Sequence, residues 1–196
     1  PHGANRAGLA TFSRLPVGDP VRKSLPISES FSKFLDLDRC YSIVRVPAGD
    51  AELVLFNVHL SAYGADASIM AAQREKLYED MTAERVAGNY VIAGGDFNQT
   101  FPGGLDKYPI KNAELWTPGT LDDSMLPDGW RFAYDTSAPT CRLDNQPYDA
   151  ESDATQHYVI DGFILSPNVE LTGVQTQDDG FRFSDHNPVL LNIRLK

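Results

Sequence analysis

Cysteine, basic residues and long apolar runs are scarce in this 196-residue sequence. The two cysteines, Cys40 and Cys141, are too few for a disulfide framework, and neither has a second cysteine at the CxxC spacing of a metal site. No stretch is long and apolar enough to predict a membrane-spanning helix. These shortages favour a soluble domain, and they leave its compartment and any membrane association open.

The first residue is Pro1 rather than methionine. We therefore expect the chain to be a processed or excised piece of a longer protein. A leader or anchor upstream would not be visible in this sequence, so the sequence leaves localisation open.

Negative charge predominates in the composition. The chain has 27 Asp and Glu against 17 Lys and Arg, which gives a formal net charge of −10. Non-specific binding of duplex nucleic acid needs a basic footprint, and this balance argues against it. The balance suits a protein that binds metal cations, or one that meets a small phosphorylated substrate at a local site. Solubility alone explains the charge equally well.

Apolar runs predict a series of β-strands, at residues 8–14, 40–46, 53–60, 89–97, 158–166, 169–175 and 188–195. Several of these runs are continuously apolar, as in strands that are covered on both faces. Between 67 and 87, apolar residues recur at four-residue spacing, which predicts a helix. The stretch 101–142 is rich in Pro, Gly and Asp and predicts irregular loops with one short helix at most. Loops beside strand ends often carry a binding site.

Polar side chains stand where two of these apolar strands end. Asp96 and Asn98 follow the run VIAGG, and Asn57 and His59 lie two positions apart in LVLFNVHL, so each pair projects from one side of its strand. Turns also favour Asp and Asn, and a single histidine in an apolar strand is more often a satisfied core residue than a ligand. The repetition at several strand ends favours a functional site.

A third group of polar residues contains a carboxylate inside an apolar strand. Asp161 interrupts YVIDGFILS, and burying its charge costs several kcal/mol unless the carboxylate is paired. His186, in the segment SDHNP, is the partner we expect, although a bond from Asp161 to the backbone is the alternative. Such a pair fixes the imidazole tautomer and raises the pKa of the histidine. Asp185 adds a hard oxygen ligand of the kind that magnesium prefers, or it simply opens a turn.

The motifs GGDFN, NVHL, VID and SDHNP, with GLATFSRLP near the start, resemble the ordered signature of the endonuclease/exonuclease/phosphatase superfamily. The match spans nearly the whole chain, from Gly8 to Leu195. The resemblance implies the fold of deoxyribonuclease I, an α/β four-layer α-β-β-α sandwich of two mixed, largely antiparallel sheets with helices outside. It also implies metal-dependent hydrolysis of a phosphoester.

The resemblance implies catalytic roles for the residues at the strand ends. Asp96 would orient and deprotonate the attacking water, and Asn98 would hold water or a phosphate oxygen. His59 would contact the scissile phosphate as part of the catalytic group, and Asn57 would bind the substrate beside it.

Further roles follow for the second half of the chain. His186, polarised by Asp161, would stabilise charge in the transition state, and Asp185 would hold the metal, Mg²⁺ or alternatively Mn²⁺. Arg142, in the stretch PTCRLDNQPYD, lies where the family varies its substrate loop and would read a phosphate. A structural ion pair is the alternative reading of Arg142.

One departure from the family pattern lies at the start of the chain. Family members carry a metal-binding Glu and an earlier Asn upstream of the strand that matches GLATFSRLP, and nothing before Gly8 corresponds to either. We therefore expect residues 1–196 to be the C-terminal two-thirds of a single domain that lacks its N-terminal strands. The missing N-terminal segment or a second chain is expected to complete the sheets, and the chain alone is expected to bind metal weakly and to expose apolar surface.

The sequence thus predicts a magnesium-dependent phosphatase or phosphodiesterase. A phosphorylated small molecule or a lipid headgroup is favoured as substrate over duplex DNA. Two alternatives remain: a nuclease that acts on nucleic acid, and a non-catalytic scaffold of the same fold that binds a phosphorylated ligand or a protein.

Overall fold

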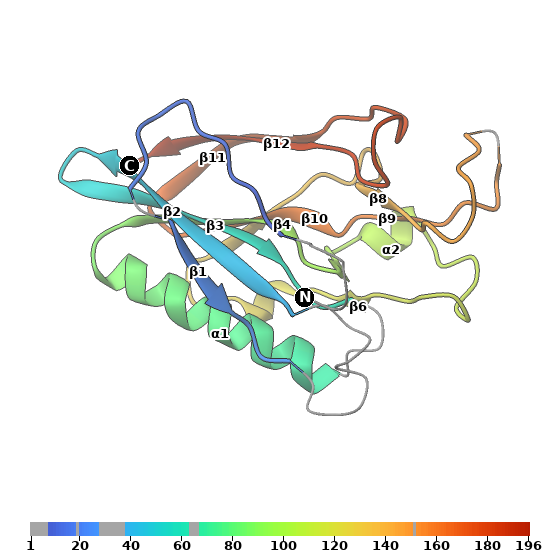
Figure 1. The fold of residues 1–196 in the computed structure, drawn as a ribbon, viewed down its shortest axis with the longest axis horizontal. Coiled ribbons are helices and arrows are strands. Elements are labelled where there is room, and N and C mark those ends of the chain that lie inside the picture. The colour runs from blue at the N-terminus through green and yellow to red at the C-terminus, as the bar shows by residue number, and fades with distance from the viewer. Residues whose placement is uncertain (1–7, 19, 28–37, 63–66, 151) are drawn as a thin grey trace.

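A mixed six-stranded β-sheet forms the centre of the computed structural model, which describes residues 8–18, 20–27, 38–62, 67–150 and 152–196 (Figure 1). Its strands in spatial order are β1 (Val21–Ser24), β2 (Cys40–Ala48), β3 (Ala51–His59), β4 (Tyr90–Asp96), β10 (Asp161–Leu165) and β7 (Arg131–Ala133). Strands β3 and β4 run parallel, and the other neighbours are antiparallel. The predicted mixed, largely antiparallel sheet is confirmed.

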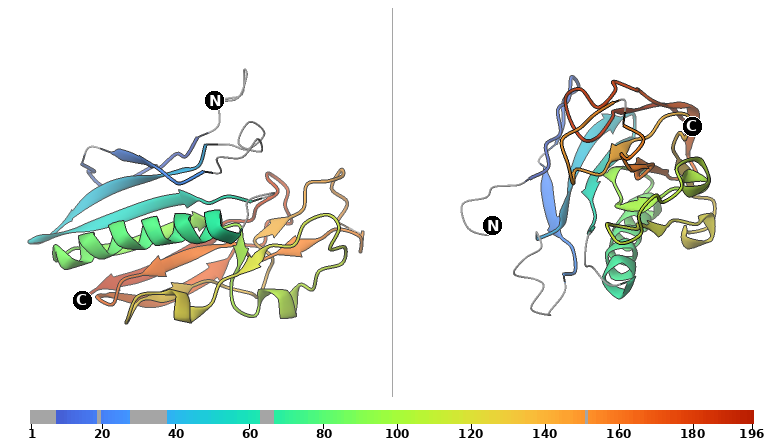
Figure 2. Two further views of the ribbon diagram at one scale, coloured as in Figure 1. Left: turned by 90° about the horizontal axis from the view of Figure 1, so that it is seen from below. Right: turned by 90° about the vertical axis from the view of Figure 1, so that its right-hand side faces the viewer.

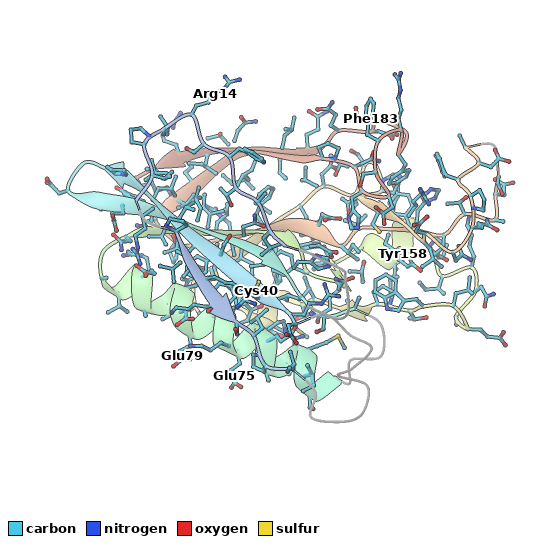
Figure 3. The ribbon with its side chains drawn as sticks, viewed as in Figure 1. Arg14, Cys40, Glu75, Glu79, Tyr158 and Phe183 are labelled. Carbon is cyan, nitrogen blue, oxygen red and sulfur yellow. The ribbon has the colours of Figure 1, made fainter. Side chains whose placement is uncertain are left out.

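Helix α1 (Ala67–Val86) connects the parallel strands β3 and β4 and covers one face of the sheet (Figure 2). Its buried residues, Gln73, Leu77 and Met81, recur at the predicted four-residue spacing. Full burial of side chains such as Leu77 and Met81 stabilises the fold by roughly 1.5–3 kcal/mol each. Glu75 and Glu79 project from the outer side of the helix (Figure 3). The helix predicted over 67–87 is confirmed.

Strands β11 (Val169–Thr176) and β12 (Val189–Leu195) form an antiparallel pair that packs on the opposite face of the large sheet (Figures 1 and 2). The apolar layer between them contains Leu53, Leu55, Ile92, Phe163, Leu165, Val169, Leu171, Leu191, Ile193 and Leu195. Because the central strands are thus covered on both faces, their sequences are continuously apolar, as predicted. The fold is the α/β sandwich of the deoxyribonuclease I type.

The outer side of the β11–β12 pair faces solvent. Leu190, Asn192 and Arg194 alternate with the packed residues of β12 and are exposed. Among the described residues, therefore, one helix, the large sheet and the β11–β12 pair account for three of the four predicted layers.

The strand predicted over 8–14 is wrong. Residues 8–13 are extended but belong to no sheet, and Phe12 is 94% exposed. A strand needs a neighbouring backbone to pair with, and no described strand pairs with this segment. The side chain of Asn57 instead holds it against β3, by donating from Nδ2 to the Ala10 carbonyl (3.0 Å) and to Thr11 Oγ1 (3.2 Å).

The strand predicted over 158–166 is divided into β9 (His157–Tyr158) and β10. At the break, the hydroxyl oxygen of Thr140 accepts the backbone N–H groups of Ile160 (3.0 Å) and Asp161 (3.1 Å). These two bonds to a side chain take the place of backbone bonds between strands. Strand β10 therefore begins only at Asp161.

The stretch 101–142, predicted as loops with one short helix at most, contains more regular structure than expected. Strand β5 (Gln99–Thr100) comes just before this stretch. The stretch itself contains α2 (Gly104–Lys107), β6 (Gly119–Thr120), the 3-10 helix η2 (Asp123–Met125), β7 and β8 (Cys141–Arg142). Strand β7 joins the large sheet beside β10. Three residues are too few to show a period-two pattern, so the sequence did not reveal this edge strand.

Two glycines allow β4 to lie close to its neighbours. At Gly94 an added Cβ would come within 2.5 Å of the Phe163 ring. At Gly95 the φ angle is +142°, and a Cβ would lie 2.1 Å from the carbonyl oxygen of Val58 in β3. Only glycine combines this backbone conformation with so close an approach.

Substitution of Gly95 by alanine is expected to lower the free energy of unfolding by roughly 3 kcal/mol or more, since a steric clash with β3 adds to backbone strain. Gly88→Ala is the matched control: its φ is +97°, but a Cβ there would meet nothing within 4 Å. Strain alone predicts a loss of about 1 kcal/mol at Gly88. Urea unfolding of both variants measures the difference, and equal losses would contradict the clash.

Candidate active site

Two carboxylates and an imidazole lie in one row across the large sheet. In the strand register, His59 of β3 pairs with Asp96 of β4, and Asp96 pairs with Asp161 of β10. Side chains alternate along each strand, so Asp96 shares its face with Ile92, and Asp161 shares its face with Leu165. Both of those apolar residues belong to the layer under β11 and β12. The row therefore stands at the end of the layer between the sheets.

Asn98 holds the carboxylate of Asp96 in place. Its backbone N–H donates to Asp96 Oδ1 (2.7 Å), and its side-chain Nδ2 donates to Asp96 Oδ2 (3.2 Å) and to the Leu60 carbonyl (2.8 Å). The φ angle of Asn98 is +50°, in the left-handed region that asparagine tolerates better than most residues. The Asp-Phe-Asn sequence thus builds a turn that orients its own first side chain, and the Nδ2 donors of Asn98 point into the protein.

A buried glutamine of α1 fixes the chain just after His59. Gln73 accepts the Ser61 N–H at its Oε1 (2.9 Å) and donates from Nε2 to the Pro26 carbonyl (2.7 Å). The amide is 0% exposed, and a buried amide is tolerated only when it is bonded in this way. His59 Nε2 lies 3.4 Å from Asp96 Oδ2.

His186 approaches the row from the loop between β11 and β12. Its Nδ1 lies 2.9 Å from Asp161 Oδ2, so the predicted Asp161–His186 hydrogen bond is confirmed. Its Nε2 is 3.9 Å from Asp96 Oδ2. A β-bridge between Cys141 and His186 and a bond from the Asn187 N–H to a backbone carbonyl (2.8 Å) hold the loop in place.

The pKa values of the two histidines shift in opposite directions. Burial lowers the pKa of His59 to about 4, and the positive charges of Arg39 and His186 act in the same direction, although 43% of the side chain is exposed. Burial also lowers the pKa of His186, but the hydrogen bond with Asp161, together with the interactions with Cys141 and the charge of Asp161, outweighs burial and raises that pKa to about 12. At neutral pH, therefore, His59 is uncharged and His186 is positively charged.

The pKa of Asp96 rises to about 7, because burial and the neighbouring charge of Asp161 disfavour its ionised form. The positive charge of His186 and the bond from the Asn98 N–H oppose this rise. A carboxyl group whose pKa lies near neutral pH is suited to accept a proton during a reaction.

The two predicted substrate-binding residues are engaged elsewhere. Asn57 lies two residues before His59 on the same face of β3, opposite Gly94, and its Nδ2 donates to residues 10 and 11. The guanidinium of Arg142 contacts Asp144 (3.0 Å) and lies over the Tyr148 ring, with 12% of the side chain exposed. These contacts match the structural ion pair that the sequence left as an alternative for Arg142. Substrate binding by either residue stays a prediction.

Asp185 lies beside the row but is not part of the close cluster of Asp96, Asp161 and His186. Its carbonyl oxygen accepts the Arg142 N–H (2.9 Å), and its negative charge acts on His59. The carboxylate accepts a bond from the Ser184 hydroxyl (3.3 Å). Its role as a metal ligand stays a prediction.

A divalent cation fits the group formed by Asp96, Asp161 and His186. Each offers one ligand atom, and these atoms lie within 4.8 Å of one another. Carboxylate oxygens suit hard cations, so Asp96 and Asp161 can ligate the ion, whereas the His186 ring could do so only after losing its proton. From the sequence, Asp161 was predicted only as the hydrogen-bond partner of His186, so its potential as a metal ligand was missed.

Two other neighbours of the row were also missed. The charge of Arg39 lowers the pKa of both His59 and Asp96, and the Cys141 thiol interacts with the His186 ring. Arg39 directly precedes the strand CYSIVRV, and a basic residue beside the end of a strand is the signal that could have identified it. The sequence carries no comparable signal for Cys141.

Comparisons with known proteins agree with this geometry. The profile of the Endonuclease/Exonuclease/phosphatase family matches residues 1–186, and the chain belongs to that family. Members of the family hydrolyse phosphoesters. A search of curated protein sequences finds no match.

Solved structures share the fold at low sequence identity. An endonuclease/exonuclease/phosphatase from Beutenbergia cavernae is 21% identical, with a TM-score of 0.61 over 93% of this chain and 46% of its own. D. rerio TDP2, complexed with a single-strand DNA product, is 15% identical, with a TM-score of 0.58 over 91% and 68%. ANGEL2, a 2′,3′-cyclic phosphatase in complex with adenosine-2′,3′-vanadate, is 14% identical, with a TM-score of 0.57 over 92% and 67%. The chain thus spans about half the length of the Beutenbergia protein.

The described helices include none with the length and apolar character to cross a membrane.

Proposed function

We propose that this chain carries the catalytic residues of a divalent-metal-dependent phosphoester hydrolase, with Mg²⁺ as the ion and Mn²⁺ as the alternative. The observation that carries the proposal is the row of His59, Asp96 and Asp161, with His186 bonded to its last member. A carboxyl group with a pKa near neutral pH, Asp96, lies 3.9 Å from a protonated imidazole, His186. That pairing suits attack of water on phosphorus.

Each side chain has one task in this proposal. Asp96, held by Asn98, accepts a proton from water as the water oxygen bonds to phosphorus and the bond to the leaving oxygen breaks. Protonated His186 donates a hydrogen bond to a phosphate oxygen as negative charge grows there, and neutral His59 contacts another phosphate oxygen. A bound divalent cation would add positive charge at the phosphate, held by the carboxylates of Asp96 and Asp161, with Asp185 as a further ligand.

The substrate we favour is a phosphorylated small molecule or a lipid headgroup. The net charge of −10 disfavours a long polyanion such as duplex DNA. Phosphorylated ends of nucleic acids are the second candidate, because a structurally similar protein is complexed with a single-strand DNA product and another with an adenosine vanadate.

We also propose that the chain is the C-terminal part of a single catalytic domain. In support, it spans 46% of the Beutenbergia protein, and its extended segment 8–13 has no described partner strand. Residues upstream would extend the sheet formed by β11 and β12. A family scaffold that only binds a phosphorylated ligand or a protein is the alternative that an activity assay separates.

Hydrolysis is expected to require a divalent cation, since the negative charges of the row would otherwise repel an anionic phosphate. The test is a panel of phosphate monoesters and diesters assayed with Mg²⁺, with Mn²⁺ and with EDTA, on the 196-residue chain and on a parent protein that includes upstream residues. EDTA should abolish turnover, and added Mg²⁺ should restore it. Ligand binding without turnover by either protein under all three conditions would favour the non-catalytic scaffold.

A further inference from the structure

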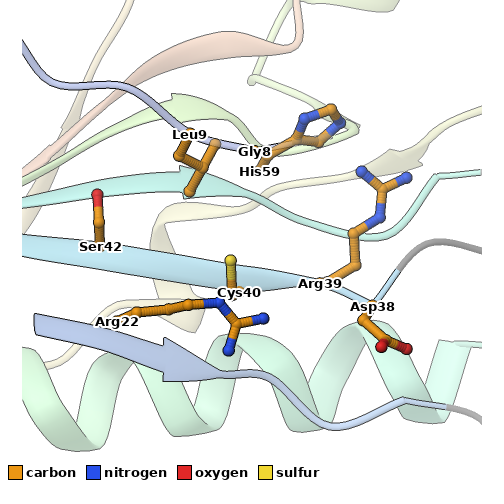
Figure 4. Close-up of a pocket in the computed structure, with 8 residues that line it drawn as sticks. All are labelled: Gly8, Leu9, Arg22, Asp38, Arg39, Cys40, Ser42 and His59. Carbon is orange, nitrogen blue, oxygen red and sulfur yellow. The ribbon is translucent and has the colours of Figure 1, made fainter. Parts of the chain in front are cut away.

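A pocket outside the catalytic row opens beside His59. It is lined by Gly8, Leu9, Arg22, Asp38, Arg39, Cys40, Ser42 and His59 (Figure 4). Its volume is about 320 Å³, at the small end of the range for ligand sites, so it suits a compact group better than a large ring system. Strands β1 and β2 form its base, where Arg22 pairs with Ser42 in the register.

The pocket is cationic in a protein that is acidic as a whole. Arg22 and Arg39 line it with one acid, Asp38. Arg22 extends from β1 and lies below Cys40, whereas Arg39 directly precedes β2 and extends toward His59 (Figure 4). A net charge of −10 repels anions over most of the surface, so a local pair of arginines determines where an anion binds.

Guanidinium groups bind oxyanions, phosphate among them. Their planar fork of N–H donors matches phosphate oxygens in two-point hydrogen bonds. Arg22 is exposed and spends one donor on Ser24 Oγ (2.9 Å), which leaves its other donors available to a ligand. The hydroxyl of Ser42 adds a neutral donor on the same face.

The pocket and the catalytic row share one side chain. His59 lines the pocket, and its Nε2 lies 3.4 Å from Asp96 Oδ2 in the row. The charge of Arg39 acts on both His59 and Asp96. A group bound in the pocket is therefore separated from a phosphate bound at the row by the His59 side chain alone.

We propose that this pocket binds a second phosphate group of the substrate, through Arg22 and Arg39, while the scissile phosphate lies at the row. The inference rests on the proposed function and narrows it to substrates with two phosphates close together. A small bisphosphate and a nucleic acid end with its adjacent phosphate share that chemistry.

The test measures occupation of the pocket without catalysis. Cys40 lines the pocket and is half-buried, whereas Cys141, the other cysteine, is buried. In buffer with EDTA, saturating inorganic pyrophosphate should slow maleimide labelling of Cys40 by about tenfold or more. Labelling of Cys141 after unfolding supplies the internal reference.

Four variants assign the effect to the pocket. Arg22→Gln and Arg39→Gln should each weaken the protection by pyrophosphate about tenfold, as expected for loss of a charged hydrogen bond. Arg39→Lys should keep part of the protection, because lysine retains the positive charge. It should not keep all of it, because the planar fork of donors is lost. Arg14→Gln, on the exposed segment before β1, should leave protection unchanged.

Protection that survives both glutamine substitutions, or that is absent from the wild-type protein, overturns the proposal. Protection in a protein that hydrolyses no phosphoester would refute the proposed function and leave the pocket assignment standing. Hydrolysis of a phosphoester without protection of Cys40 would overturn the pocket assignment and leave the proposed function standing. Comparing a hexose bisphosphate with a 5′-phosphorylated dinucleotide then identifies the source of the second phosphate by which compound protects Cys40 at lower concentration.

Discussion

Replacing Asp96 with asparagine is expected to lower kcat for phosphoester hydrolysis roughly a thousandfold, within the range typical for loss of a general base. Asparagine keeps the shape of the side chain, and its amide can still bond to Asn98, so the fold and KM should change little. What is lost is the group that accepts the proton from water. For the wild-type protein the rate should increase as pH rises through about 7, the pKa of Asp96, because only the ionised carboxylate accepts a proton.

Glu75→Gln is the matched control for this experiment. It makes the same carboxylate-to-amide change on the outer side of α1, away from the row (Figure 3). Thermal unfolding of both variants checks that neither change disrupts the fold. Near-normal turnover by the Asp96→Asn protein with Mg²⁺ would exclude Asp96 as the base.

The second large effect is expected at His186. His186→Ala should lower kcat about a hundredfold or more, as for the removal of one donor that stabilises transition-state charge. Asp161→Asn should do less damage near pH 6, because it removes the partner of the imidazole and leaves the imidazole itself in place. Measured kcat values for the two variants test this order, and equal losses would contradict it.

The pH profile separates the two residues further. In the wild-type protein the bond with Asp161 keeps His186 protonated through neutral pH. Without that carboxylate, the pKa of His186 should fall toward its ordinary value of about 6.5, so the charged form is lost as pH rises through that range. The Asp161→Asn protein should therefore lose activity between about pH 6 and pH 8, relative to wild type. If the ratio of Asp161→Asn activity to wild-type activity stays constant with pH, Asp161 does not control the protonation of His186.

Much of the fold follows from local pattern. Helix α1 was predictable because Gln73, Leu77 and Met81 share one face at four-residue spacing, and the central strands because burial on both faces requires continuous apolar sequence. The segment 8–14 has the composition of a strand but no partner among the described residues. Pairing is a property of the tertiary structure, so composition alone predicted this segment wrongly.

The candidate site was predictable where charge imposes a partner. Asp161 lies within an apolar strand, so its need for a polar contact pointed to His186, and the contact is present at 2.9 Å. Arg142 shows the opposite case. A long flexible side chain has several acids and aromatic rings within reach, and only the folded chain selects Asp144 and Tyr148. The cavity beside His59 was out of reach of the sequence for the same reason, because segments distant in sequence form its walls.

The row of His59, Asp96 and Asp161 depends on the register of three adjacent strands, β3, β4 and β10. This dependence limits where insertions and deletions can occur in the chain. Residues added within the exposed stretch 144–147 leave the three strands paired as they are. One residue gained or lost within β4 would turn Asp96 toward the face where Val91 and Ala93 are completely buried, and would bring an apolar residue into the row. Insertions and deletions are thus tolerable around the site, whereas β4 accepts only substitutions.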